Sequence, residues 1–168
     1  MAVVFKRVLI IGLGYIGQQL ATTLHQRGIT VYGMRRTKAE DNICPAQMIY
    51  TDIASCTRDQ IPEVDAIIYL ITPNAYTESD YQKAYPKGLA RTLELMPSSV
   101  QRVIFASSSC VYEQQHGEWV DENTLVEPTH FSGQAMYTAE STLLHHSVTG
   151  CSIRFSGIYG PDRYRRFL

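Results

Sequence analysis

The chain has 168 residues, of which 45% are hydrophobic and 18% charged, and its 15 Lys and Arg residues almost balance 16 Asp and Glu residues. This composition is typical of one soluble globular domain spanning 1–168 and excludes disordered, collagen-like and coiled-coil chains. The formal net charge of −1 provides no excess positive charge for nucleic acid or an anionic membrane surface, so we expect neither as a partner.

The cysteines and histidines lack the spacing of a metal or disulfide site. The cysteines stand at positions 44, 56, 110 and 151, without a Cys-x-x-Cys pair or a histidine at zinc-site spacing. The apolar start of the chain contains Lys6 and Arg7 and is interrupted by glycines, which fits neither a signal peptide nor a membrane span. We therefore expect no metal and a cytoplasmic protein.

Short β-rich runs alternate with helical patterns, which predicts an α/β protein with a doubly wound parallel sheet, the Rossmann fold. Val8–Ile11 is wholly apolar, as is typical of a central parallel strand. The helix after it carries an apolar stripe and ends at Gly28; the other main helices are predicted at Ser79–Met96, bent by Pro86, and at Gln134–Ser147. The remaining strands are predicted at Thr30–Met34, Gln47–Tyr50, Ala66–Ile71, Val103–Ala106 and Ser152–Ser156.

A glycine-rich loop joins the first predicted strand to the first helix. Its residues, Gly12-Leu13-Gly14-Tyr15-Ile16-Gly17, form the pattern GxGxxG in the strand-to-helix context that a dinucleotide site requires. Gly12 permits a tight turn, Gly14 leaves room for a pyrophosphate at the positive end of the helix, and Gly17 allows close packing. The alternative is a glycine-rich turn without a ligand.

The end of the second strand predicts which dinucleotide binds. An NAD-binding domain normally has an acidic residue there for the ribose hydroxyls, but this chain has Arg35 and Arg36. A guanidinium group can bind the 2′-phosphate of NADP with two hydrogen bonds, so the sequence favours NADP over NAD. The alternative is a pair of solvated surface arginines.

Two further strand ends complete the expected cofactor site. Asp52 and Ile53 follow the third strand, where they can meet the adenine, although an Asp at a strand end is often only a turn cap. Leu70, Ile71 and Thr72 lie at the end of the fourth strand, beside the crevice in which such sheets bind ligands.

A run of serines, Ser107 to Ser109, follows the fifth strand and places a hydroxyl beside the expected nicotinamide. Besides these serines, the chain contains motifs that follow the order of a known family: the glycine loop, Asp52-Ile53, Val111-Tyr112, Trp119–Glu122 and Tyr159-Gly160-Pro161. On these motifs, the chain resembles the extended short-chain dehydrogenase/reductase family, the nucleotide-sugar epimerases and dehydratases. The resemblance covers nearly the whole chain. It implies an NAD(P)-dependent oxidoreductase or epimerase acting on a small carbonyl, carbinol or sugar-nucleotide-like substrate.

Within this resemblance, Ser108 takes the place of the catalytic Ser/Thr, but the family's Tyr-x-x-x-Lys falls on Ser132 and Met136. Ser132 is a catalytic candidate by position only, because an aliphatic hydroxyl does not ionise near neutral pH and Met136 carries no charge. Tyr137 follows Met136 by one residue, which on a helix rotates its side chain by about 100°, so we do not expect its phenol to replace the missing tyrosine. Two further departures from the usual pattern resemble the atypical branch of the family. Ile11 stands where most extended members have an extra glycine, and Tyr85 stands where an Asn often precedes Gly88.

The sequence leaves two functions open. Ser108 and the cofactor loop favour an oxidoreductase or epimerase, whereas the missing Tyr and Lys favour a dinucleotide-binding sensor or interaction module without redox chemistry. The chain ends shortly after Tyr159-Gly160-Pro161, where family members continue into a substrate-binding lobe, so we expect that lobe to be absent. The substrate is not predicted, and a homodimer stays open.

Overall fold

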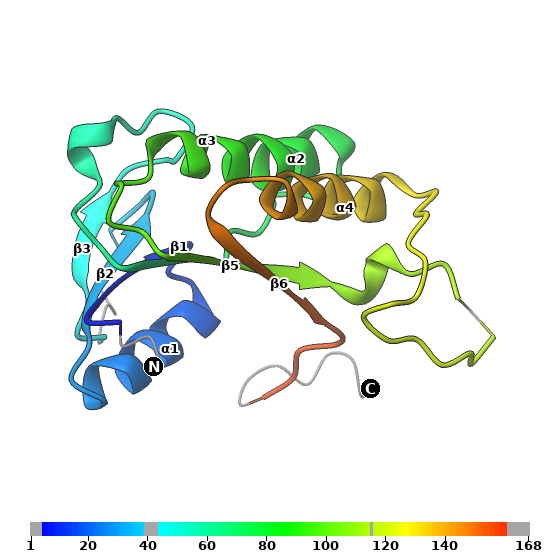
Figure 1. Cartoon of the computed structure of the whole chain (residues 1–168), viewed down its shortest axis with the longest axis horizontal. Helices are drawn as coiled ribbons and strands as arrows, with labels where there is room; N and C mark the ends of the chain where they lie inside the picture. Colours follow the sequence, from blue (N-terminus) through cyan, green and yellow to red (C-terminus); the bar gives the residue numbers. More distant parts are fainter. Residues whose placement is uncertain (1–4, 39–43, 115, 161–168) are drawn as a thin grey trace.

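The computed structural model describes residues 5–38, 44–114 and 116–160, which form one six-stranded sheet covered by helices on both faces (Figure 1). The strand order is β3-β2-β1-β4-β5-β6, and every neighbouring pair is parallel. The order reverses between β1 and β4, which confirms the doubly wound Rossmann-type sheet. The strands are β1 (Arg7–Ile11), β2 (Thr30–Arg35), β3 (Gln47–Tyr50), β4 (Ala66–Tyr69), β5 (Arg102–Ser108) and β6 (Thr149–Phe155).

The helices divide between the two faces of the sheet. Helix α1 (Tyr15–Gln26) covers one face, and α2 (Glu78–Gln82), α3 (Gly88–Leu95) and α4 (Phe131–Leu144) cover the other (Figure 1). Two short 3₁₀ turns, η1 (Arg58–Gln60) and η3 (Ser109–Val111), follow β3 and β5. As predicted, α1 ends just before Gly28, whose φ of 78° lies in the left-handed region.

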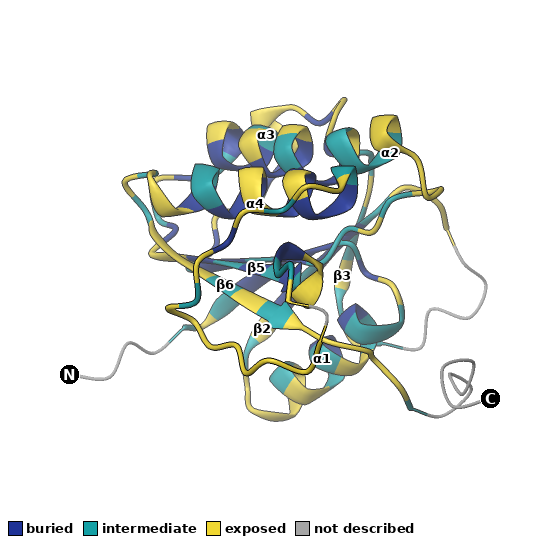
Figure 2. Ribbon diagram, turned by 90° about the vertical axis from the view of Figure 1, so that its right-hand side faces the viewer, coloured by how far each residue is buried: buried dark blue, intermediate teal, exposed yellow. Residues whose placement is uncertain are grey.

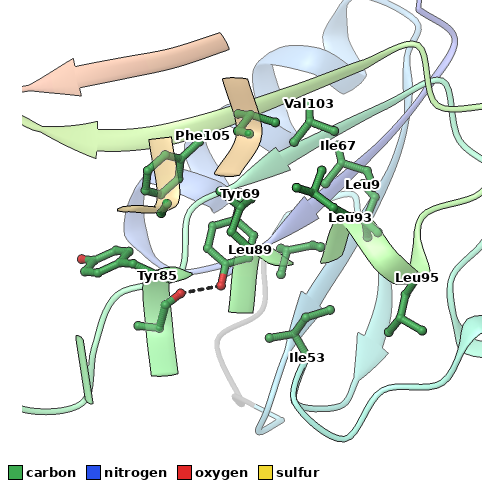
Figure 3. Close-up of a cluster of buried hydrophobic side chains, with 14 of the residues drawn as sticks. Leu9, Ile53, Ile67, Tyr69, Tyr85, Leu89, Leu93, Leu95, Val103 and Phe105 are labelled. Carbon is green, nitrogen blue, oxygen red and sulfur yellow. Dashed lines mark hydrogen bonds between the residues drawn. The ribbon is translucent and has the colours of Figure 1, made fainter. Parts of the chain in front are cut away.

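The side chains of β1 alternate between the two faces of the sheet, and both faces are buried, as expected for a central parallel strand. Val8 and Ile10 pack toward α1, whereas Leu9 and Ile11 join the larger cluster on the other face. Figure 3 shows that larger cluster, in which Tyr69 and Phe105 are fully buried between the sheet and the helices above it.

The predicted ranges of β4, β5 and β6 each differ from the observed strand by two or three residues at one end. Strand β4 stops at Tyr69 rather than Ile71: β1, its neighbour on one side, ends at Ile11, and the last bond between the two runs from Leu70 N–H to the Ile11 carbonyl. Strands β5 and β6 pair continuously along their whole lengths, so both begin before the apolar residues of their predicted ranges. The face of β6 that remains exposed in Figure 2 explains why its polar start was not predicted.

The long helix predicted at Ser79–Met96 is three segments. Between α2 and α3 the chain forms a π-helical turn, η2 (Lys83–Lys87), in which Gly88 N–H donates to the carbonyl of Lys83 and the ring of Pro86 is accommodated. The buried Tyr69 hydroxyl donates to the carbonyl of Ala84 at 2.5 Å and supports this turn from below (Figure 3). Helix α4 begins three residues before its predicted start, because His130 Nδ1 caps it by accepting from Ser132 N–H.

Candidate functional site

One cleft of about 860 Å³ lies at the carboxyl ends of the strands, at the switch point between β1 and β4. It brings together every residue that the sequence assigned to the cofactor and also Ser108, but not Ser132. The residues on its walls that the sequence predicts to bind the cofactor are Gly12, Gly14, Tyr15, Ile16, Gly17, Arg35, Arg36, Asp52, Ile53, Leu70, Ile71 and Thr72.

The glycine loop forms the floor of the cleft and has the geometry of an anion site. Gly12 has a φ of 98°, and a Cβ there would lie 2.6 Å from the backbone of Leu70 and Ile71, so the loop and β4 pack without side chains between them. A Cβ on Gly14 would meet nothing within 4 Å, which leaves open space before α1. No side chain caps α1 and no acidic residue lies in its first turn, so the positive end of the helix faces the cleft without a protein anion.

The two arginines after β2 differ in their surroundings. Arg36 is exposed, and its Nη2 donates to Asn74 Oδ1 at 2.6 Å, across the cleft from β2 to the loop after β4. Arg35 is half-buried, and its Nη1 is shielded from solvent without a hydrogen-bond acceptor in the described part of the chain. A shielded cationic donor without a partner is costly, so the cleft fits an anionic group beside Arg35.

The residues that follow strands β3 and β4 also line the cleft. Asp52 Oδ1 accepts from Ala54 N–H at 2.9 Å, so this carboxylate caps a turn, as the simpler interpretation of the sequence proposed. Ile53 is 4% exposed and packs in the core beneath it. Leu70, Ile71 and Thr72 follow β4 and contribute backbone and side chains to the same wall.

Ser107 and Ser108, at the end of β5, have different hydrogen-bond partners. Ser107 is buried, and its hydroxyl donates to Glu140 Oε1 on α4. Ser108 lines the cleft, and its Oγ accepts from Cys110 N–H at 3.2 Å, which fixes the hydroxyl at the start of η3. Ser108 Oγ can still donate its proton or accept a second hydrogen bond from a ligand.

The family's Tyr and Lys positions carry no acid or base toward the cleft. Ser132 is buried, lies off the cleft, and its Oγ is 2.9 Å from His130 Nδ1. Met136 lines the cleft with a thioether in place of an ammonium group. Tyr137 is 41% exposed and is not a cleft residue, in agreement with its expected rotation.

The structure adds cleft residues that the sequence analysis did not assign. Asp80, Lys83 and Tyr85 come from the irregular region of α2 and η2, and Asn74 comes from the loop after β4. The sequence contains one sign that this region could reach the cleft, namely Pro86 inside a helical pattern. A proline interrupts a helix and so changes which side chains face the edge of the sheet.

In residues 5–38, 44–114 and 116–160 there is no helix long and apolar enough to cross a membrane. The same ranges contain no group of three or more His, Cys, Asp and Glu side chains that could hold a metal ion.

Comparison with known proteins gives a consistent family. Residues 8–168 match the family model described as the NAD dependent epimerase/dehydratase family. The protein YeeZ of Escherichia coli K12 is 30% identical over 172 residues, which cover 95% of this chain and 61% of YeeZ. The chain therefore spans about three fifths of the length of this relative.

Solved structures show the same partial coverage. A Methylobacillus flagellatus structure described as an NAD-dependent epimerase/dehydratase superposes with a TM-score of 0.76 at 32% identity, covering 95% of this chain and 57% of the other. MoeE5, solved in complex with UDP-glucose and NAD, gives a TM-score of 0.81 at 25% identity and covers 92% of this chain and 56% of its own.

Proposed function

This chain belongs to the NAD dependent epimerase/dehydratase family, and on that basis we propose that its cleft binds NADP(H) for an oxidoreductase or epimerase reaction. The substrate is a small carbonyl or carbinol compound, with sugar nucleotides the first class to test because the similar MoeE5 binds UDP-glucose. When bound, the nicotinamide supplies or accepts a hydride.

The observation that carries the cofactor proposal is Arg35. Its shielded Nη1 lacks an acceptor in the described chain, and its position is that of the residue which selects between NAD and NADP. A 2′-phosphate supplies the missing acceptor and charge, whereas a ribose hydroxyl supplies no charge. Gly12, Gly14 and the uncapped start of α1 hold the pyrophosphate.

Ser108 is the residue that we assign to the substrate oxygen. Its hydroxyl lines the cleft and is oriented by the bond from Cys110 N–H. In the family resemblance this position belongs to the catalytic Ser/Thr, and the described geometry leaves the hydroxyl able to bind a carbonyl or carbinol oxygen.

Calorimetric titration with NADP⁺ and NAD⁺ tests the proposal. Charge-assisted hydrogen bonds to the 2′-phosphate contribute on the order of 2 to 3 kcal/mol, which corresponds to roughly a 30- to 150-fold preference for NADP⁺. Equal dissociation constants would reject the NADP assignment, and no binding of either dinucleotide would reject the site.

A dinucleotide-binding module without redox chemistry is the second candidate. It is favoured by Ser132, whose hydroxyl lies off the cleft beside His130, and by the uncharged Met136. The two functions are separated by mixing the protein and NADPH with aldehydes, ketones and sugar nucleotides. Loss of absorbance at the NADPH band supports the enzyme, and tight NADPH binding without oxidation by any compound supports the module.

A further inference from the structure

Tyr85 is a buried phenol whose hydroxyl has no hydrogen-bond partner in the described part of the chain. The residue is only 6% exposed, yet it lines the cleft together with Ser108 and Met136. Tyr69, the neighbouring buried phenol, satisfies its hydroxyl on the carbonyl of Ala84. In Figure 3 the hydroxyl of Tyr85 points away from this core cluster, toward the carboxyl ends of the strands. The buried ring therefore presents an unbonded hydroxyl to the cleft, where a ligand can accept a hydrogen bond from it.

The packing holds the Tyr85 ring in one orientation. Its ring contacts Phe105 at a centroid distance of 6.1 Å and Tyr81 at 5.4 Å, both edge-on. The π-helical turn η2 carries the residue, and the bond between Tyr69 and Ala84 supports that turn. A ring held in this way presents its hydroxyl to the cleft without further ordering.

Cys110 lines the same cleft as Tyr85 and Ser108. Its backbone N–H donates to Ser108 Oγ at 3.2 Å. Burial raises the pKa of Tyr85, and the nearby Tyr81 hydroxyl and Cys110 thiol raise it further. The Tyr85 phenol therefore stays protonated at neutral pH and acts as a donor toward the same end of the cleft.

We propose that the Tyr85 hydroxyl donates a hydrogen bond, and during reduction a proton, to the substrate oxygen bound by Ser108. This inference rests on the proposed function and assigns to Tyr85 the acid that Ser132 and Met136 do not provide. As the carbonyl carbon receives a hydride, the electron pair of the C–O π bond moves to the oxygen. The oxygen takes the proton of Tyr85 to give an alcohol, and water returns a proton to the tyrosinate.

The test uses 4-(dimethylamino)cinnamaldehyde, an aldehyde whose absorption moves to longer wavelength when its carbonyl oxygen accepts a hydrogen bond. The protein is first saturated with NADP⁺, so the aldehyde is not reduced and the readout is spectroscopic. We expect a red shift with the unmodified protein, loss of most of it in Tyr85→Phe, and its retention in Tyr81→Phe. Tyr81→Phe is the matched control because Tyr81 is the adjacent phenol but does not line the cleft.

Each variant is also titrated with NADP⁺ and melted, since Phe keeps the ring packing at both positions. Unchanged NADP⁺ affinity and melting temperature show that any lost shift comes from the hydroxyl. No red shift with NADP⁺ bound, or an equal shift in Tyr85→Phe, overturns the role of Tyr85 but leaves the cofactor proposal in place. Failure of the unmodified protein to bind NADP⁺ overturns the proposed function, and the role of Tyr85 falls with it. For any aldehyde that the NADPH complex reduces, kcat should fall by about 10²- to 10⁴-fold in Tyr85→Phe.

Discussion

Glu140 and Arg154 form a two-pronged ion pair between α4 and β6, with Glu140 Oε2 2.8 Å from Arg154 Nη2 and Oε1 3.0 Å from Nε. The same carboxylate accepts from the Ser107 hydroxyl, and the same guanidinium group donates to the Tyr112 hydroxyl at 2.8 Å. The hydrogen bond to Glu140 raises the pKa of Arg154 above its already high value, so the arginine is charged at any ordinary pH. This network ties β5, β6 and α4 together immediately behind Ser108.

Glu140→Ala should lower the free energy of unfolding by about 3 kcal/mol, because it leaves a part-buried guanidinium group and the buried Ser107 hydroxyl without their acceptor. Denaturant unfolding measures the change. The control is Glu94→Ala, which removes the exposed partner of Arg91 within one helix and should cost no more than about 0.5 kcal/mol. Equal losses in the two variants would mean that the network contributes no more than a surface ion pair.

Arg35→Ala should remove most of the preference for NADP⁺. We expect the dissociation constant for NADP⁺ to rise roughly 30-fold or more and that for NAD⁺ to change little, because only the former carries the 2′-phosphate. Arg27→Ala is the control, since Arg27 lies at the opposite end of α1. An unchanged ratio of the two constants in Arg35→Ala would assign selectivity to another residue.

Gly14→Val should abolish dinucleotide binding while leaving the protein folded. The added side chain enters open space in the cleft, where the pyrophosphate is expected, and displaces nothing in the core. Gly17→Val is the comparison, because its Cβ would lie 2.9 Å from the Gly12 carbonyl oxygen and should destabilise the fold as well. Circular dichroism and calorimetry together separate the two effects. Tight binding by a folded Gly14→Val variant would show that the loop is only a turn.

Tyr69→Phe should cost about 1 to 3 kcal/mol of stability, because the buried carbonyl of Ala84 loses its donor. The half-buried Tyr32 hydroxyl makes no hydrogen bond within the described ranges, so Tyr32→Phe should change stability by less than about 0.5 kcal/mol. Thermal or denaturant unfolding of the two variants measures the difference in stability. If both variants were equally stable, the bond to Ala84 would not support the π-helical turn.

Asp65 should make stability depend on acid pH. Burial by itself would raise the pKa of Asp65, but the N–H groups of Lys6 and Arg7 and the Arg7 guanidinium group together lower it. A lowered folded-state pKa means that the stabilisation is complete above the unfolded value of about 4 and is lost as the pH falls through the folded value. Between about pH 5 and pH 2 the unmodified protein should therefore lose more stability than Asp65→Asn. Parallel curves for the two proteins across this range would contradict the assignment.

The sequence alone determined the fold class of this protein and located the glycine-rich loop between β1 and α1. Apolar strands with a helix between them are local patterns, and GxGxxG after a strand is a local motif, so both are visible without knowing which segments meet. The place of Arg35 at the end of β2 could also be predicted, because its distance from the glycine loop follows from the length of one helix and one strand.

Only the tertiary structure decided which side chains share the cleft and which lie away from it. Ser132 takes a catalytic position in the family resemblance, yet it lies beside His130 off the cleft. In the sequence Tyr85 is only a departure from the family pattern, yet the π-helical turn around Pro86 carries it to the cleft that the glycine loop also lines. A π turn changes the direction of the side chains around it, and the Tyr69 hydroxyl that bonds this turn comes from a strand distant in sequence. Long-range contacts of this kind set the orientation of side chains, and local sequence patterns do not contain them.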